Sequence, residues 1–374
     1  MLAEDIQAVP PDSAMRACIQ KVATGPEYSK DLSFDEARRA MQLILDNAVD
    51  PVQSGVYLIA LRMKRETDAE NRGTLQALLD ASDIVTAPVD EVVDIADLYD
   101  GYTRALPASP FLPAVLAACG VPAITHGVES VGPKYGATTR KVLRAAGAPV
   151  DLSPAQAAAC LGRSEPGWAY LDQRAFCPRL HDLIALRARI VKRPVLTTVE
   201  NLLGPIRGRR KTHLVTGYVH KAYPSVYASL ARHAGFASAA IVRGVEGGVV
   251  PSLQQPAGLT YYHDGGAEQT LDITPQSIGI DQNTRAVPIP GDLAGGDAGG
   301  APDPNADRIA TAAAERGLAA LQGEAGATRD SMVYGGALVL FHLRHHGSLA
   351  AAAEAVRGAL DSGRARAHFE AGLR

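Results

Sequence analysis

The chain has 374 residues, of which 47% are hydrophobic, and this is enough apolar material for two folded domains without disulfides. The formal net charge of -3 excludes a global attraction to nucleic acid or membrane, so any such affinity must come from local clusters of charge. Aromatic residues make up only 5% of the chain, which argues against extended base-stacking platforms.

The cysteines and the start of the chain indicate where the protein resides. The four cysteines are far apart and lack Cys-x-x-Cys spacing, so we interpret them as reduced core thiols. The first residues lack the basic and apolar regions of a signal peptide, and no apolar run approaches the roughly 20 residues that span a bilayer. We therefore expect a cytoplasmic protein with no membrane partner.

Residues 1–95 are predicted to form a small helical domain. Ser33 and Glu36 have the spacing of a capping box, and apolar residues at helical spacing follow them. A second helix is predicted after Asp50, which can cap it, with Pro51 at its first position.

Residues 96–374 are predicted to form a larger α/β domain. Short apolar or β-branched runs, such as residues 121–125 and 239–242, alternate with helical segments and are bounded by glycine. This alternation is typical of a central sheet flanked by helices.

Five segments, in the same order along the chain, resemble the anthranilate phosphoribosyltransferase superfamily. They are residues 31–67, 118–130, 142–161, 199–205 and 330–340. The resemblance covers nearly the whole chain. It implies an α/β protein with a small helical domain, a larger domain with a central sheet, and a cleft between them. It also implies that part of residues 178–205 returns to the helical domain and that the protein is a homodimer through that domain.

The phosphate-binding motifs of the superfamily are altered at the matching positions. Its Gly-Thr-Gly-Gly-Asp loop, whose backbone amides hold a pyrophosphate, falls on residues 97–101, which read Asp-Leu-Tyr-Asp-Gly. Its Asn-x-Ser-Thr element falls on residues 107–110 and keeps only Ser109. Pro107 and Pro110 remove two N–H donors. We therefore expect weak binding of a pyrophosphate group here.

A second motif of the superfamily, Lys-His-Gly-Asn-Arg with the serine-rich stretch after it, survives in part. The resemblance implies that the matching residues contact substrates or anions: His126, Gly127, Ser130, Lys134 and Gly136. In addition, Arg187 matches the arginine that contacts the carboxylate of the acceptor, while Val128 replaces the asparagine that meets it.

The magnesium site of the superfamily is not expected in this chain. Its Asp-Gly-Leu-Asp-Glu motif supplies adjacent carboxylates to the cation, and the matching residues begin at Glu246 and end in Val249 and Val250. Phosphoribosyl transfer depends on a pyrophosphate leaving group neutralised by that metal. We predict no metal, no cofactor, no catalytic residue of the family's type and no anthranilate reaction.

Basic residues are concentrated in residues 187–221, where nine lysines and arginines accompany a single acid, Glu200. A flexible basic loop can follow a phosphate backbone, and the residues predicted to bind nucleic acid are Arg193, Arg207, Arg209, Arg210 and Lys211. A further basic run is expected near the same cleft: Lys134, Arg140, Lys141 and Arg144. The alternative interpretation is a solvated surface run without a partner.

Two functions follow from these observations. The first is a dimeric protein of the transferase fold that binds nucleic acid without sequence specificity, which agrees with a resemblance to the transferase-like paralogue group that binds nucleic acid. The second is an active glycosyl or phosphoribosyl transferase with an acceptor other than anthranilate, for which Ser109, His126, Ser130 and Lys134 would contact anions. A pyrimidine-nucleoside phosphorylase is disfavoured, because neither its longer chain nor its glycine-rich phosphate loop is present. The choice between DNA and RNA stays open.

Overall fold

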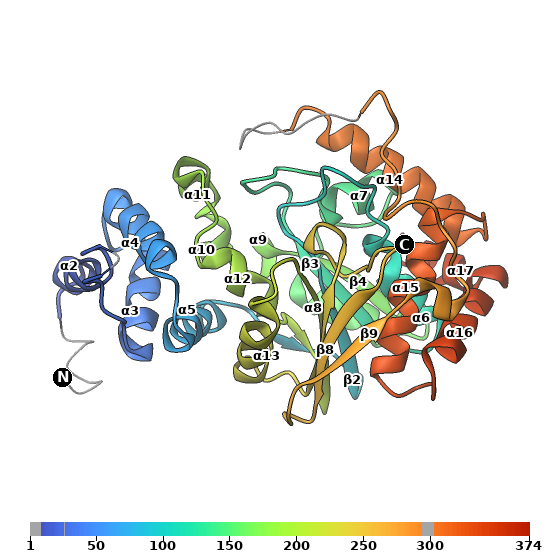
Figure 1. The fold of residues 1–374 in the computed structure, drawn as a ribbon, viewed down its shortest axis with the longest axis horizontal. Coiled ribbons are helices and arrows are strands. Elements are labelled where there is room, and N and C mark those ends of the chain that lie inside the picture. The colour runs from blue at the N-terminus through green and yellow to red at the C-terminus, as the bar shows by residue number, and fades with distance from the viewer. Residues whose placement is uncertain (1–8, 26, 294–302) are drawn as a thin grey trace.

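The computed structural model describes residues 9–25, 27–293 and 303–374 and contains a helical bundle beside a larger α/β domain (Figure 1). The bundle consists of α2 (Pro11–Val22), α3 (Phe34–Leu45), α4 (Pro51–Lys64) and α5 (Asp68–Asp80). The predicted caps are confirmed. Ser33 accepts a hydrogen bond from the backbone N–H of Glu36, whose side chain accepts one from the backbone N–H of Ser33, and Asp50 accepts one from the backbone N–H of Val52 at 2.7 Å.

The central sheet has seven strands in the order β4-β3-β2-β6-β7-β8-β9, with the first five parallel and the last two antiparallel. The strands are β2 (Glu91–Ala96), β3 (Ala123–Gly127), β4 (Trp168–Asp172), β6 (Lys211–Tyr218), β7 (Ser238–Arg243), β8 (Ala257–His263) and β9 (Gln269–Ile273). A separate parallel pair joins β1 (Val85–Thr86) to β5 (Ile206–Arg207). The predicted α/β class is confirmed.

Helices cover both faces of this sheet and create two hydrophobic cores. Alternate residues of β2 point to opposite faces: Val93 and Ile95 lie in one core, Val92 and Ala96 in the other. The first face packs against α6 (Leu112–Ala118), α7 (Thr139–Ala145), α14 (Ala306–Leu321), α15 (Ala327–His342), α16 (Leu349–Asp361) and α17 (Arg364–Ala371). The second core extends from α8 (Pro154–Leu161) and α13 (Tyr223–His233) into the helical bundle.

The bundle is linked to the α/β domain by helices from the middle of the chain. These are α9 (Gln173–Phe176), α10 (Pro178–His181), α11 (Ile184–Ile190) and α12 (Leu196–Val199), and α11 lies beside α4 (Figure 1). The predicted domain boundary after residue 95 falls inside β2, so residues 91–95 belong to the sheet and not to the helical domain. The reason is that β2 is an apolar strand, buried from its second residue onward between β3 and β6.

Helix α13 is tied to the bundle by three hydrogen bonds. Arg62 of α4 donates to the hydroxyl of Tyr223 at 3.1 Å, Ser229 donates to Asp68 at 2.7 Å, and His233 and Gln76 share a bond of 3.0 Å. Across the described residues, no helix is long and apolar enough to cross a membrane. The cytoplasmic location stays a prediction.

Candidate functional site

A cleft of about 520 Å³ opens where the parallel strands end, between the α/β domain and α4. Its floor is formed by the segments that follow β2, β3 and β7 and by the end of β6, which is the usual ligand position in open parallel sheets. One wall carries two tyrosines of α13, Tyr223 and Tyr227, whose ring centroids are 5.7 Å apart. Arg62 of α4, which donates a hydrogen bond to Tyr223, also lines the cleft, as do Thr197, Thr198, Glu200 and Asn201.

Lys134 lies on the cleft floor between two carboxylates. Its ammonium is 3.4 Å from Glu246 Oε2 and 3.7 Å from Asp100 Oδ1, and it donates a hydrogen bond to the carbonyl of Gly101 at 3.2 Å. Arg193 contacts the other oxygen of Asp100 at 2.5 Å. Two of the cations predicted from the sequence, Lys134 and Arg193, therefore line the cleft, and each forms an ion pair with an acidic side chain there.

The other residues predicted to bind anions lie beneath the cleft or beside it, and none of them is among its lining residues. Ser109 is buried and donates a hydrogen bond to Asp97. Burial raises the pKa of the Asp97 carboxyl, although hydrogen bonds from Ser109 and Tyr102 oppose this shift. His126 is buried, with Nε2 3.0 Å from Asp94 Oδ1 and Nδ1 bonded to the hydroxyl of Tyr99.

The remaining predicted positions of this motif do not line the cleft. Gly127 ends β3 against Tyr170, and Ser130 is half-buried in the loop that follows. A Cβ atom at Gly136 would lie 2.5 Å from the carbonyl oxygen of Tyr102, so the close approach of these two backbones requires glycine. The structure brings Lys134 and Arg193 together at the cleft but not Ser109, His126, Gly127, Ser130 or Gly136.

Arg187, predicted to contact an acceptor, is held in a buried ion pair. Its two terminal nitrogens lie 2.6 and 2.7 Å from the two oxygens of Glu200, and the side chains of both residues are at least 98% buried. This bidentate pair uses the terminal N–H groups of the guanidinium, which would otherwise be available to the carboxylate of an acceptor.

The basic loop predicted to bind nucleic acid lies at the opposite edge of the sheet from the cleft, because β6 starts at Lys211 and ends at Tyr218. Arg207 stacks on Phe236 at 4.3 Å and donates to the carbonyl of Leu203, and burial lowers the pKa of its guanidinium. Two further members of the loop form ion pairs: Arg209 with Asp90 at 3.0 Å, and Lys211 with Asp264 at 2.8 Å. Arg210 is exposed.

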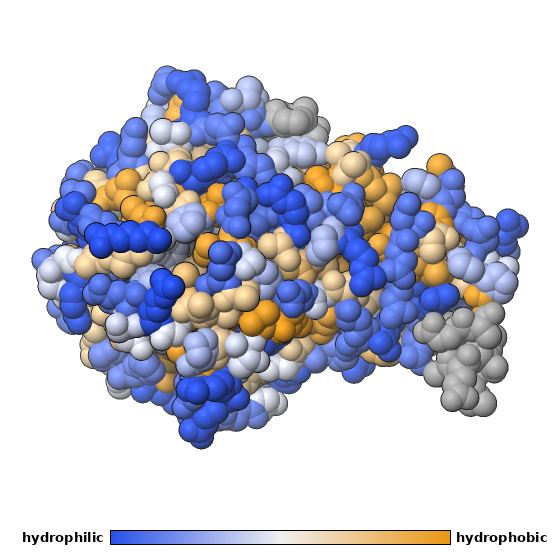
Figure 2. Space-filling view, turned by 180° about the vertical axis from the view of Figure 1, so that it is seen from behind, coloured by the Kyte–Doolittle hydropathy of each residue, from blue (hydrophilic) through white to orange (hydrophobic). Residues whose placement is uncertain are grey.

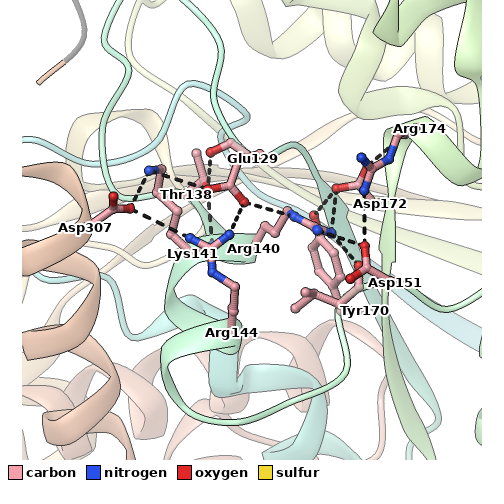
Figure 3. Close-up of polar contacts among 11 residues, drawn as sticks. Glu129, Thr138, Arg140, Lys141, Arg144, Asp151, Tyr170, Asp172, Arg174 and Asp307 are labelled. Atoms are coloured by element: carbon pink, nitrogen blue, oxygen red, sulfur yellow. Dashed lines mark hydrogen bonds and ion pairs between the residues drawn. The ribbon is translucent and has the colours of Figure 1, made fainter.

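The second basic run, expected near the cleft, is enclosed by acids (Figure 3). Arg140 contacts Glu129, Asp151 and Asp172 at 2.8 to 3.0 Å and is largely buried. Lys141 and Arg144 both approach Glu129 and Asp307. This network joins the loop after β3 to β4 and α14, so it stabilises the fold and leaves these cations little capacity for a ligand.

Other exposed cations line the cleft or lie next to residues that line it. Arg104 lines the cleft, Lys192 precedes Arg193, Lys221 follows the lining residue His220, and Arg243 pairs in register with Tyr218. None of these four, which we call the cleft-mouth cations (Arg104, Lys192, Lys221 and Arg243), has an ion-pair partner within residues 9–25, 27–293 and 303–374. Sequence reasoning counted Lys192 and Lys221 only as part of a run and missed Arg104 and Arg243, which stand alone in the sequence.

The opposite edge of the sheet also holds a histidine network. Ser238 bridges His213 Nδ1 and His342 Nε2, each at 2.8 Å, and the ring of His263 stacks on His342 at 4.6 Å. Burial, with the nearby His263, lowers the pKa of His342 to about 3. A cavity of about 230 Å³ adjoins His213 and Glu91.

The residues predicted from the sequence to match the magnesium motif of the superfamily do not offer ligands for a divalent cation. Val249 and Val250 are buried in the hydrophobic core and offer no oxygen ligand. The carboxylates of Glu246 and Asp100 already share the ammonium of Lys134. In the described part of the chain, no cluster of three or more His, Cys, Asp or Glu side chains has metal-binding geometry.

Two family models match the chain over most of its length. The helical bundle domain of a glycosyl transferase family matches residues 16–82, and the a/b domain of a glycosyl transferase family matches residues 106–366. The chain therefore belongs to this glycosyl transferase family.

Within the family, its relatives place the chain in the anthranilate phosphoribosyltransferase superfamily, as the sequence motifs predicted. Anthranilate phosphoribosyltransferase of Desulforudis audaxviator is 30% identical over 354 residues, covering 94% of this chain and 93% of the relative. That of Chelativorans sp. is 31% identical over 287 residues, 76% of this chain and 78% of the relative.

Solved structures share the fold. Anthranilate phosphoribosyltransferase from Thermus thermophilus superposes with a TM-score of 0.71 at 21% identity, covering 96% of this chain and 98% of that chain. The enzyme from Saccharomyces cerevisiae in complex with PRPP and Mg gives a TM-score of 0.73 at 17% identity, covering 96% and 97%.

Proposed function

We propose that this transferase-fold chain binds nucleic acid across the mouth of the cleft, without sequence specificity. The observation that carries the proposal is the set of cleft-mouth cations, which are exposed and lack ion-pair partners in the described part of the chain. Arginine and lysine side chains in this state attract phosphates and release counterions when they bind.

Tyrosines in the cleft supply the second part of the argument. Tyr223 and Tyr227 form one wall, and Tyr218 lines the floor beside Arg243. Aromatic faces next to cations stack on bases of any sequence, which accounts for binding without base-specific contacts. The pattern fits single-stranded segments, because a base must leave a duplex to reach an aromatic side chain.

This proposal moves the predicted nucleic-acid site. Arg193 stays in it as a lining residue of the cleft. The loop that contains Arg207, Arg209, Arg210 and Lys211 does not carry it, because three of these side chains already contact Phe236, Asp90 and Asp264. The cleft-mouth cations replace the loop, and no resident metal is needed for this function.

The second candidate function is glycosyl or phosphoribosyl transfer to an acceptor other than anthranilate. It is favoured by the cleft at the ends of the parallel strands and by relatives named anthranilate phosphoribosyltransferase. Against it stand the sequestered Arg187 and the two carboxylates bridged by Lys134. Release of pyrophosphate from phosphoribosyl pyrophosphate, measured across a panel of acceptors with and without magnesium, tests this function.

A homodimer through the helical domain is part of the proposal. Val52, Val56 and Met63 form an apolar stripe on α4 and are 72%, 43% and 77% exposed. Hydrophobic residues, drawn in orange, reach the surface over the helical domain at the right of Figure 2. Met63→Glu is expected to shift the mass measured by light scattering from dimer to monomer; a wild-type monomer would contradict this part.

Fluorescence anisotropy with labelled single- and double-stranded oligonucleotides tests nucleic-acid binding. If about four phosphates are neutralised, affinity should fall roughly a hundredfold between about 50 and 200 mM salt. Phosphoribosyl pyrophosphate with magnesium serves as the competitor. Salt-sensitive oligonucleotide binding supports the proposal, and its displacement by the competitor supports a location at the cleft. Absence of oligonucleotide binding at low salt contradicts it and favours a small ligand.

A further inference from the structure

The side chain of Glu246 lies in a cradle of hydrogen-bond donors on the cleft floor. Its Oε1 accepts a hydrogen bond from the backbone N–H of Arg104 at 2.8 Å. Its Oε2 accepts from the backbone N–H and the hydroxyl of Thr103, at 3.3 and 3.4 Å, and lies 3.4 Å from the ammonium of Lys134. Two main-chain amides, one hydroxyl and one ammonium thus converge on a single carboxylate.

The backbone of Glu246 indicates that this placement is not the relaxed one. Its φ of 55° lies in the left-handed region, which side chains other than glycine rarely adopt. The residue lies in a turn whose flanking glycines, Gly244 and Gly248, pack closely against other atoms, so release of the cradle requires movement of the Glu246 side chain and not of the whole segment. The Glu246 side chain is only 9% exposed, and the contacts it makes with the cradle keep it there.

Every member of the cradle also lines the cleft. Thr103, Arg104, Lys134 and Glu246 all face this space, and Arg104 adds an exposed guanidinium beside its own backbone N–H. Asp100 is the nearest opposing charge, and Arg193 and Lys134 contact its two oxygens. If the Glu246 carboxylate moves away, the same donors become available to an anion that enters the cleft.

We propose that the backbone amides of Thr103 and Arg104, together with Lys134, form a phosphate-binding site that Glu246 occupies in the unliganded protein. Consecutive backbone N–H groups with a nearby lysine are a known arrangement for phosphate oxygens. The ligand class is a phosphate group, either a phosphodiester of a nucleic acid or a free phosphate compound. This inference deepens the proposed function and rests on it for the first of these two sources.

The decisive variant is Glu246→Gly, because it removes the internal carboxylate and glycine suits a φ of 55°. Glu246→Gln keeps the side chain and removes its charge. Asp272→Asn is the matched control. Asp272 is exposed on β9 and outside the cradle, and it adds to the effect of burial, which raises the pKa of the cleft residue Tyr218. It removes one negative charge near the cleft without altering the cradle.

Binding of inorganic phosphate is measured by titration calorimetry at constant ionic strength, and binding of a single-stranded oligonucleotide by anisotropy. We expect Glu246→Gly to bind one phosphate at least about tenfold tighter than the wild type. If the Glu246 side chain occupies the site about nine-tenths of the time, only a tenth of the molecules can bind phosphate, and the apparent affinity for phosphate falls about tenfold. Glu246→Gln should fall between the two, Asp272→Asn should match the wild type, and adding Lys134→Met to Glu246→Gly should abolish the gain. Thermal unfolding of Glu246→Gly checks that it folds.

The outcomes separate this inference from the proposed function. Equal phosphate affinity in Glu246→Gly and Asp272→Asn overturns the proposed phosphate site. If both variants then gain equally in oligonucleotide affinity, the gain is an effect of net charge, and the proposal of nucleic-acid binding still stands. A phosphate gain in Glu246→Gly, with no oligonucleotide binding by any variant, supports the cradle with a free phosphate compound as its ligand and contradicts nucleic-acid binding. A gain for both probes in Glu246→Gly alone supports the cradle with the phosphodiester as its ligand.

Discussion

Both ends of the central sheet carry basic side chains, and the two ends differ in what those side chains contact. At the amino ends of the strands, Arg207 stacks on Phe236, and Arg209 and Lys211 pair with Asp90 and Asp264. At the carboxyl ends, the cleft-mouth cations are exposed and line the cleft or lie next to residues that line it. A high density of basic residues in a sequence is therefore a poor predictor of ligand binding. The number of acidic side chains that form ion pairs with those residues in the folded protein is a better one.

The largest effect is expected where a cation is most completely paired. Arg187→Ala should lower the free energy of unfolding by about 3–5 kcal/mol, because it leaves the buried carboxylate of Glu200 without a countercharge. Denaturant unfolding measures this loss. The double variant Arg187→Met/Glu200→Leu should recover most of it. If Arg187→Ala instead kept full stability, Arg187 would not be a structural residue.

The cleft-mouth cations should give the next largest effect, on binding and not on stability. Replacing Arg104, Lys192, Lys221 and Arg243 by alanine should weaken oligonucleotide binding about a hundredfold and reduce the slope of log affinity against log salt by about three. Anisotropy across a salt series measures both quantities. An unchanged salt slope would show that these side chains do not contact phosphates, and the comparison of the two ends would then fail.

The histidine network at the amino ends of the strands should make stability depend on pH. The pKa of His342 is lowered to about 3 in the folded protein, against about 6.5 for an unfolded histidine. Below pH 6.5 the unfolded state binds a proton that the folded state does not, so stability is lost as the pH falls, by about 1.4 kcal/mol per pH unit. Denaturant midpoints between about pH 7 and 4.5 measure this slope. His342→Gln should make it shallower by one proton, and an identical slope in the variant would exclude His342.

The smallest effect is expected for the paired basic loop. Replacing Arg209, Arg210 and Lys211 by alanine should change oligonucleotide affinity by less than about threefold, because Asp90 and Asp264 already neutralise two of these cations and the loop lies away from the cleft. The same anisotropy assay applies, with the cleft-mouth variant as the positive control. A loss as large as that of the cleft-mouth variant would return the nucleic-acid site to the loop.

Local signals in the sequence predicted much of the fold. The capping box at Ser33 and the cap at Asp50 identified two helix starts, and the apolar runs near residues 121–125 and 239–242 identified the strands β3 and β7. Caps and buried strands depend on neighbouring residues, so a local pattern reveals them. The strand β2 was placed in the wrong domain, since its apolar pattern does not say which sheet it joins.

The site was harder to predict, because its interactions join distant parts of the chain. Lys134 and Glu246 are 112 positions apart, and Arg193 and Asp100 are 93 apart. No local sequence pattern predicts such pairs. A run of basic residues was therefore predicted to be free to bind a ligand, although acidic side chains surround it in the folded protein. Arg104 and Arg243 carried no sequence signal, because a lone arginine resembles any other surface residue.

The hydrogen bonds that tie α13 to the bundle limit how the cleft can change its width. Arg62 and Tyr223 line the cleft and are bonded to each other, while Ser229 and His233 bond to α5 along the same helix. A hinge motion that swings the bundle away from the sheet must either break these bonds or carry α13 with it. In the second case Tyr223 and Tyr227 move together with the bundle. The distance between Tyr223 and Lys134 then measures whether the cleft is open or closed.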